Sequence, residues 1–461
     1  MGTAVGASSD DQPPPRLLLA LYDLLFLLGL LLASPYLLFR AAIRERYRTG
    51  FSQRLSLRLP SSRRPNRPRI WIHAASAGEM VAVAALVQTL QRRRPEFDVL
   101  LSSMTTSGLA VARRLLPALE CFLSPLDLGP VVRRVMNRVD PVALILVELE
   151  LWPNLLACAA ARGVRVAVAN GRIGERSARR YALGPVWRWV GFPLVNLYAV
   201  QAEAYAGRLR ALGVAAERIV VTGNLKLDVE PGSGQDRASV RADLGFGPEV
   251  QVVVAGSTHP GEEALIGAAI ASLQRDFDGR LRLVIAPRHK ERLADATADL
   301  QNAGLDPVCL SRFRGGEAGS VVVVDTMGEL AGLYLAADLA IVGGTLIPGI
   351  GGHNVFEPVL AGARTLVGKY HGNVRSDVLF LEEIGALEVT ESAGLHARLR
   401  ELLRAGTTGL EETTRVKLAA ARGAAERTCD QIEAFCLSAV SGLADGRRGQ
   451  QESSGPSTHQ D

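Results

Sequence analysis

The sequence has few cysteines and lacks the common signatures of cofactor-binding proteins. Its five cysteines stand singly in apolar or helical segments, without a CxxC pair: Cys121, Cys158, Cys309, Cys429 and Cys436. This spacing indicates reduced core residues of a cytosolic protein and implies no metal site. No segment fits GxGxxG or GxxxxGK[ST], and no DxD pair stands in a metal-ligand context. The sequence therefore favours neither an NAD-binding nor an ATP-binding function.

Excess positive charge is confined to one short segment. The chain has 52 Lys and Arg against 47 Asp and Glu, a net charge of +5. Ten arginines and one acid between Arg40 and Arg69 give that segment +9, whereas residues 1–39 and residues 70–461 carry −2 each. Because the body is slightly acidic, we expect no nucleic-acid partner. The arginine-rich segment is either a solvated linker or a site for the headgroups of an anionic membrane surface.

A leucine-rich run, Leu17–Phe39, lies between Arg16 and Arg40 and is about long enough to span a bilayer. The residues before it are acidic and no cleavage site follows, so we expect a retained membrane anchor rather than a signal peptide. Asp23 is costly inside a bilayer, which leaves an in-plane helix and an ordinary buried helix as alternatives. By the positive-inside rule, the arginines place everything after residue 40 in the cytosol.

The 461 residues suffice for two to three domains, and 48% hydrophobic residues with 46 glycines indicate globular domains with many tight turns. From Arg69 onward, short apolar runs alternate with helical stretches, and the pattern begins again after Asp228. We therefore predict an α/β fold with two doubly wound Rossmann-like domains facing a cleft. The predicted strands are Ile70–Ala74, Val99–Ser102, Val142–Val147, Val164–Ala169, Ala199–Gln201, Ile219–Thr222, Val252–Ala255, Leu283–Ala286, Val321–Val324, Leu339–Val342 and Thr365–Val367. The predicted parts are 1–48 (anchor and start of the basic segment), 67–228, 229–248 (linker), 249–440 and 446–461 (disordered tail).

Glu79 follows the first predicted strand, in the segment WIHAASAGEM. The small residues of this segment permit a substrate to approach the backbone, and Glu79 is expected at the beginning of a helix. A carboxylate in that position either complements the helix dipole or acts as a general base in the cleft.

Glu148 and Glu150 follow the predicted strand Val142–Val147, and strand alternation predicts that they share one face. Two carboxylates at a strand's carboxyl end suit a site that positions hydroxyls or pairs with a cation, with helix capping as the alternative. Lys226 follows the last strand of the first domain. It is either a phosphate or carboxylate partner across the cleft or an exposed lysine at a hinge.

In the second predicted domain, basic residues and glycines gather where strands end. The segment PRHKER, which begins at Pro287, places several cations after one strand, as suits a phosphate. Residues 343–352 form a glycine-rich loop before a helix whose free N–H groups are expected to face an anion. Glu357, one turn into that helix, is expected to accept the hydroxyls of a ribose.

Seven ordered segments make the chain resemble the transferases of 3-deoxy-D-manno-octulosonic acid (Kdo), which act in lipopolysaccharide synthesis. They are WIHAASAGE, ELELWPN, NGRIGERS, GNLKLD, PRHKER, MGEL and GGHNVFEP, and the resemblance runs from Leu17 to Ala425. It implies an inverting GT-B glycosyltransferase that needs no metal or other cofactor. The implied donor is CMP-Kdo and the implied acceptor is a lipid A precursor (lipid IVA), reached from an amino-terminal membrane anchor.

The resemblance also implies roles for individual residues. Glu79 matches the general base of the family, and Glu148 and Lys226 match groups that stabilise the transition state. The positions that match CMP-binding residues are Pro287, Arg288, Gly328, Glu329, Leu330, Asn354, Val355, Phe356 and Glu357. The chain departs from the family at Val355, where Pro is usual, at Thr345, where Ser is usual, and at Lys369-Tyr370, where a Gly-Pro step is usual.

Two other classes of function remain as alternatives. A GT-B nucleotide-sugar epimerase or UDP-sugar transferase would have the same architecture but no need for the anchor. A non-catalytic membrane scaffold would not need Glu79, Lys226 and Arg288 at strand ends.

Overall fold

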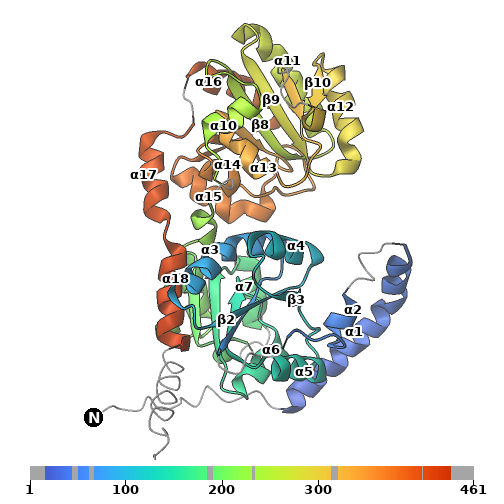
Figure 1. The fold of residues 1–461 in the computed structure, drawn as a ribbon, viewed down its shortest axis with the longest axis vertical. Helices are drawn as coiled ribbons and strands as arrows, with labels where there is room; N and C mark the ends of the chain where they lie inside the picture. The colour runs from blue at the N-terminus through green and yellow to red at the C-terminus, as the bar shows by residue number, and fades with distance from the viewer. Residues whose placement is uncertain are drawn as a thin grey trace, which may run out of the picture. The chain divides into compact units, whose positions relative to one another are not determined.

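The computed structural model describes residues 16–43, 50–61, 67–183, 191–230, 234–312, 320–406 and 409–437. The predicted tail, 446–461, and parts of the arginine-rich segment lie outside the described residues. The chain divides into two compact units (Figure 1). The first domain comprises Met1–Val229 together with Arg422–Asp461, and the second comprises Glu230–Ala421.

The first domain is built on a parallel sheet of seven strands in the order β3-β2-β1-β4-β5-β6-β7. The strands are β1 (Arg69–His73), β2 (Asp98–Ser103), β3 (Cys121–Leu123), β4 (Pro141–Val147), β5 (Arg165–Gly171), β6 (Leu197–Val200) and β7 (Ile219–Val221). The helices are α1 (Arg16–Ile43), α2 (Phe51–Arg54), α3 (Ala77–Arg93), α4 (Thr106–Leu115), α5 (Gly129–Val139), α6 (Pro153–Ala160), α7 (Glu175–Leu183), α9 (Glu203–Ala211) and α18 (Ala424–Ile432).

Both faces of this sheet are buried, which explains why its central strands are apolar at nearly every position. In β1, Ile70 and Ile72 enter the core under α3, α4 and α18, while Trp71 enters the core under α5, α6 and α9. The same alternation holds in β4, where Ile145 and Leu146 face opposite cores. Each core is therefore closed by helices from one side of the sheet.

The second domain repeats this architecture with seven parallel strands in the order β10-β11-β9-β8-β12-β13-β14. The strands are β8 (Gln251–Thr258), β9 (Leu281–Pro287), β10 (Pro307–Cys309), β11 (Val321–Val323), β12 (Leu339–Val342), β13 (Arg364–Gly368) and β14 (Leu387–Thr390). The helices are α10 (Arg237–Asp243), α11 (Glu262–Gln274), α12 (Leu293–Asn302), α13 (Leu330–Leu333), α14 (Phe356–Leu360), α15 (Arg375–Glu383), α16 (Leu395–Arg404) and α17 (Glu412–Ala421). The two predicted doubly wound domains are thus confirmed.

Three strands were not predicted: β3, β10 and β14. All three lie at edges of their sheets and have three or four residues. Length alone does not separate them from β7 and β11, which have three residues and were predicted, and their pairing with a neighbouring strand defines them.

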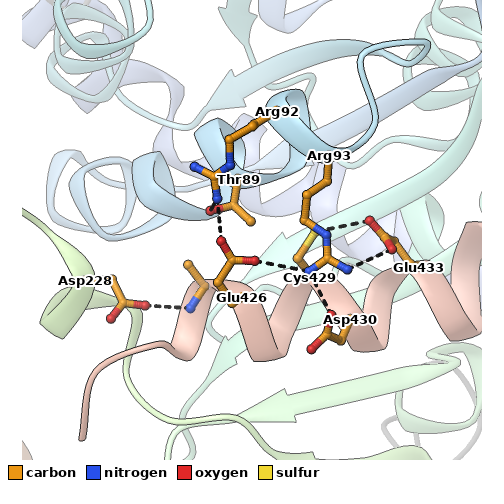
Figure 2. A network of polar contacts seen from close by, with 9 residues as sticks. Thr89, Arg92, Arg93, Asp228, Glu426, Cys429, Asp430 and Glu433 are labelled. Carbon is orange, nitrogen blue, oxygen red and sulfur yellow. Dashed lines mark hydrogen bonds and ion pairs between the residues drawn. The ribbon is translucent and has the colours of Figure 1, made fainter. Parts of the chain in front are cut away.

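The carboxyl-terminal helix α18 belongs to the first domain, not to the second as the predicted range 249–440 implied. Ala424, Cys429 and Ile432 complete the core beside α3. On the outside, Arg93 of α3 pairs with Glu426 at 3.1 Å, Asp430 at 2.7 Å and Glu433 at 3.1 Å (Figure 2). The whole second domain, Glu230–Ala421, separates α18 from the rest of the first domain in the sequence, so no local pattern predicts that α18 covers the first sheet. The predicted linker range also changes, because α10 forms within it and packs in the second domain.

Candidate active site

Glu79 lies in the first turn of α3, directly after the turn that leaves β1. Ser76 caps this helix, and its side chain accepts the backbone N–H of Glu79 at 3.3 Å. The Glu79 carboxylate accepts two hydrogen bonds, from the N–H of Ala75 at 2.7 Å and from the Ser76 hydroxyl at 3.0 Å. These contacts hold the carboxylate back over the turn, at the carboxyl end of β1.

The surroundings of the Glu79 carboxylate favour its protonated form. Burial, followed by the charge of Glu148, raises its pKa from 4.5 to about 7, and Glu150 acts in the same direction. The two hydrogen bonds that the carboxylate accepts lower the pKa but do not outweigh these effects. A carboxylate tuned in this way is typical of general acid–base groups. Complementing the helix dipole does not explain such a pKa, because that interaction favours the charged form.

Glu148 lies beyond the end of β4, so the predicted strand alternation does not apply to it. The backbone of Glu148 has φ of +59°, a left-handed conformation that is costly for a non-glycine residue. Its N–H donates to the carbonyl of Ala169 at 2.9 Å, and its carboxylate pairs with Arg172 at 3.3 Å. Strain of this kind persists where neighbouring contacts fix the chain, and here the contacts with Ala169 and Arg172 do so.

Glu150 has a different partner. Its carboxylate accepts the indole N–H of Trp152 at 3.1 Å, and burial raises its pKa. The structure therefore brings the predicted acids Glu79 and Glu148, with Glu150, to one edge of the sheet, where β1 and β4 are neighbours.

Lys226 lies in a short 3₁₀ turn, Leu225–Asp228, that packs against α3. Asn224 caps this turn by accepting the N–H of Lys226 at 3.0 Å. The N–H of Leu225 donates to the side chain of Asn170 at 2.9 Å. The backbone that carries Lys226 is thus fixed on both sides of the residue.

Asn170 is a site residue that the sequence interpretation missed. It is fully buried, has φ of +57° and ties the end of β5 to the turn that carries Lys226. Its side-chain N–H₂ has no partner among the described residues. The signal was available in the sequence, because an Asn-Gly pair after an apolar run marks a turn with left-handed backbone.

In the second domain, Pro287 ends β9 and Arg288 follows with an exposed side chain. Arg288 lies near two histidines from other loops, His259 and His353, whose Nε2 atoms are 2.8 Å apart. Burial, then His259 and Arg288, lower the pKa of His353 to about 4. A neutral histidine pair beside an arginine suits an anionic group of a ligand.

Arg292 differs from its neighbour Arg288. The position of Arg292, a turn beyond the end of the strand, predicts a side chain more exposed than that of Arg288. In the structure it instead forms an ion pair at 3.0 Å with Glu263, whose side chain is fully buried. Arg292 therefore stabilises the domain. It is not a neutral surface residue.

The start of the glycine-rich loop binds an acid of the protein, whereas the N–H groups predicted to face an anion belong to α14 at its other end. The buried carboxylate of Glu262 accepts the N–H groups of Gly344 at 2.7 Å, Thr345 at 3.1 Å and Leu346 at 2.9 Å. It also accepts the N–H of His259 at 3.0 Å. An acid of the protein itself thus satisfies the donors at the start of this loop, and it sets the loop's shape.

The predicted donor-binding residues at the far end of this loop surround the start of α14. The Asn354 side chain accepts the N–H of Phe356 at 3.1 Å and donates to Glu357 at 3.0 Å. The side chains of Val355 and Phe356 are buried, at 0% and 1% exposed. Val355, which stands where Pro is usual, and Phe356 are therefore part of the interior at the start of α14.

Gly328, Glu329 and Leu330 form the turn into α13, and Gly328 has φ of +84°. The next helical turn carries Tyr334, whose pKa is raised by burial and by the charge of Glu357. The two groups of residues predicted to bind CMP, 328–330 and 354–357, are thus neighbours in the second domain. The residues that the structure describes include no group of three or more His, Cys, Asp or Glu side chains arranged to hold a metal ion.

Comparisons with known proteins decide the family. Residues 44–229 match the family model of the 3-deoxy-D-manno-octulosonic-acid transferases (kdotransferases). The Kdo transferase of Bordetella pertussis is 35% identical over 380 residues, which cover 79% of this chain and 86% of that protein. The chain belongs to the Kdo transferase family. The enzyme of Haemophilus influenzae agrees, at 30% identity over 86% of this chain and 92% of the relative.

A Kdo transferase is a glycosyltransferase of lipopolysaccharide biosynthesis, so the alternative of a non-catalytic scaffold is set aside. Among solved structures, UDP-N-acetylglucosamine 2-epimerases share the fold. The Listeria monocytogenes protein has a TM-score of 0.55 at 14% identity, covering 80% of this chain and 96% of that one. The Neisseria meningitidis enzyme has a TM-score of 0.54 at 13% identity, covering 80% of this chain and all of the other. At these identities the likeness shows the GT-B architecture alone, and the sequence relatives distinguish the transferase from the epimerase.

Proposed function

We propose that this Kdo transferase moves Kdo from CMP-Kdo to a lipid A precursor, lipid IVA, with inversion at the anomeric carbon. The observation that carries the proposal is the half-buried carboxylate of Glu79, held at the end of β1 by Ala75 and Ser76 in a domain of the Kdo transferase family. Burial and Glu148 raise its pKa to about 7. A base of that strength is half ionised at neutral pH, which suits removal of a proton from a sugar hydroxyl.

The transfer is a single displacement. The hydroxyl oxygen of the acceptor attacks the anomeric carbon of Kdo while its proton passes to the carboxylate of Glu79. The bond from that carbon to the phosphate oxygen breaks, and CMP leaves with one more negative charge. One attack from the face opposite the leaving group inverts the configuration. Glu148 supports this step by keeping the pKa of Glu79 high, and Lys226 is the cation that stabilises charge in the transition state.

The second domain binds the donor in this proposal. Arg288 supplies a cation for the phosphate, and Glu357, held by Asn354, accepts hydroxyls of the ribose. Pro287 and the turn 328–330 complete the surface for CMP, and the buried residues 355–356 support it from the interior. Fixed cations suffice to neutralise the leaving phosphate, so we propose that no metal or other cofactor takes part.

The site of action in this proposal is the cytoplasmic face of the inner membrane. The described helix α1 includes an apolar stretch of 21 residues, Arg16–Tyr36, with a mean hydropathy of 2.3. Together with the arginine-rich segment that follows in the sequence, it suits attachment to an anionic membrane, where a lipid acceptor resides.

The test uses the purified full-length chain with CMP-Kdo, with and without lipid IVA, in EDTA. We expect CMP release that depends on lipid IVA, a product heavier by one or more Kdo residues, and inverted anomeric configuration by NMR. Acceptor-independent release of CMP, a retained configuration or complete loss of turnover in EDTA would each contradict the corresponding part of the proposal.

A further inference from the structure

One face of α1 lies against the first domain and the other face is bare. Side chains that are partly covered recur every three or four residues along the helix: Leu18, Leu19, Tyr22, Asp23, Phe26, Leu30, Ala33 and Ser34. Between them the leucines are exposed, among them Leu17 at 82%, Leu24 at 62% and Leu31 at 68%. This spacing is one stripe of a helix, so α1 has a protein-facing side and an apolar outer side.

The covered side is fixed by a charged residue, Asp23. Its carboxylate accepts the N–H of Gly129, the first residue of α5, at 3.2 Å, and the side-chain N–H₂ of Asn154 at 2.8 Å. Asn154 also donates to the carbonyl of Asp127 at 2.8 Å. A Cβ atom at Gly129 would lie 2.9 Å from the Asp23 carboxylate, so glycine is needed for this approach.

The same contact extends to the neighbouring residues of α1. The hydroxyl of Tyr22 hydrogen-bonds Asp127, whose carboxylate also accepts the N–H groups of Asn154 at 3.0 Å and Leu155 at 2.9 Å. Leu19 packs on the core beside α5 and α6. Figure 1 shows α1 running beside α5. The helix is therefore held to a folded domain by polar and apolar contacts at Leu19, Tyr22 and Asp23.

These contacts conflict with a helix that crosses the membrane. Asp23 is seven residues into the helix, or about 10 Å along an apolar region of about 30 Å in a bilayer. If α1 spanned the bilayer, the polar start of α5 and the side chains of Asp127 and Asn154 would have to enter the hydrocarbon with it. Buried polar groups of this kind are expensive in lipid.

We propose that α1 lies in the plane of the membrane, with its covered side on the first domain and its exposed leucines in the hydrocarbon of one leaflet. The occupant of the bare face is lipid, because this face is almost entirely leucine and the following sequence carries the net charge of +9 that suits anionic headgroups. The arrangement rests on the proposed membrane attachment but not on the transfer chemistry. It places the amino terminus on the same side of the membrane as the catalytic domains.

Protease accessibility tests this placement. The full-length chain carries one epitope tag before Met1 and another after Asp461, and it is expressed in cells from which inverted inner-membrane vesicles are made. We expect protease to remove both tags without detergent. Removal of the carboxyl-terminal tag alone, with the amino-terminal tag protected until detergent is added, would overturn the proposal in favour of a spanning helix.

Depth measurements provide a second test with matched variants. Leu17→Trp, Leu24→Trp and Leu31→Trp place an indole on the exposed side, two helical turns apart. In vesicles of phosphatidylethanolamine and phosphatidylglycerol, we expect brominated lipids to quench all three by the same factor, after subtraction of the wild-type signal. Strong quenching of Leu24→Trp with weak quenching of Leu17→Trp would overturn the in-plane arrangement. It would also be overturned if no variant were quenched and the chain self-associated, because the exposed leucines would then contact a second copy of the chain.

The polar contact is tested by Asp23→Leu, which extends the apolar run and removes the carboxylate. We expect this variant to produce a population whose amino-terminal tag is protected. Complete removal of the tag, as in the parent chain, would show that Asp23 does not determine the placement. CMP release by the parent chain in the same vesicles distinguishes this proposal from the proposed function. Activity with a protected amino-terminal tag would contradict only the in-plane placement of α1. An accessible tag without activity would contradict only the proposed transfer reaction.

Discussion

Glu79 and Glu148 are 69 positions apart in the sequence, yet the charge of Glu148 is the largest electrostatic contribution to the raised pKa of Glu79 after burial. They meet because β1 and β4 are adjacent in the parallel sheet, and each acid follows its strand at the same edge. In the proposed reaction, one of the two carboxylates makes the other a base of suitable strength.

This relationship predicts the pH dependence of transfer. A base with a pKa of about 7 is protonated in acid, so kcat/KM should fall about tenfold per pH unit below pH 7 and reach a plateau above pH 8. Glu148→Gln removes the neighbouring charge and should move the midpoint toward lower pH, in addition to any loss of maximal rate. Pre-steady-state rates of CMP release from pH 5 to 9 measure both. An unchanged midpoint in Glu148→Gln would contradict the coupling.

Glu79→Gln should reduce transfer by at least about 10²-fold, the scale expected for loss of a general base. The variant should remain folded. The raised pKa of Glu79 contributes stability that is present below about pH 4.5 and is lost as pH rises through about 7, and a neutral Gln does not suffer that loss. Calorimetric titration with CMP should give wild-type affinity. The control is Glu175→Gln, a change at the exposed start of α7. Near-wild-type turnover by Glu79→Gln would show that Glu79 only complements the dipole of α3 and is not the general base.

Arg288→Ala should weaken CMP and CMP-Kdo together, because the lost contact is with the phosphate that they share. A charge-assisted hydrogen bond contributes about 1.5–3 kcal/mol, or roughly 10- to 150-fold in affinity. The control is Arg280→Ala, since Arg280 precedes the same strand β9 at its other end and its side chain is 60% exposed. Equal losses in the two variants would indicate diffuse attraction rather than a phosphate site.

Glu262→Gln should destabilise the second domain and weaken CMP binding. The substitution replaces an oxygen that accepts loop N–H groups with an N–H₂ group, and each buried donor left unpaired costs about 1–3 kcal/mol. Thermal unfolding of the variant and of Glu291→Gln, a change at an exposed acid nearby, measures the effect. A transition equal to that of the parent would mean that water replaces the carboxylate without cost.

Asp228→Ala should loosen α18 from the first domain. Asp228 accepts the N–H groups of Gly423 and Ala425, both at 2.6 Å, at the start of this helix. Figure 2 shows Asp228 beside the start of this helix. Loss of such a cap costs about 0.5–2 kcal/mol. Hydrogen exchange of α18 should rise in Asp228→Ala and less in Asp228→Asn, which keeps one acceptor. Equal protection in all three proteins would assign the stability of α18 to its apolar contacts alone.

Short continuous runs of apolar residues were enough to predict the central strands of both sheets, since burial of both faces requires apolar residues at successive positions such as Ile70 and Trp71. The ordered motifs were enough to predict the family, and the position of Glu79 after a strand was enough to make it a candidate base. Each of these properties is local, because it depends on which residues follow one another.

The tertiary structure decided which charged groups and N–H groups from distant segments lie close enough to interact. The order of the strands, not their sequences, brings Glu148 to Glu79, and Glu262 accepts from the glycine-rich loop because β8 and β12 are paired. In the sequence, Asp23 is a costly charge inside a candidate membrane span. In the structure, its carboxylate accepts hydrogen bonds from Gly129 and Asn154. Local periodicity reports which side of an element is buried, but the partner that a buried charge finds there depends on the packing of the whole domain.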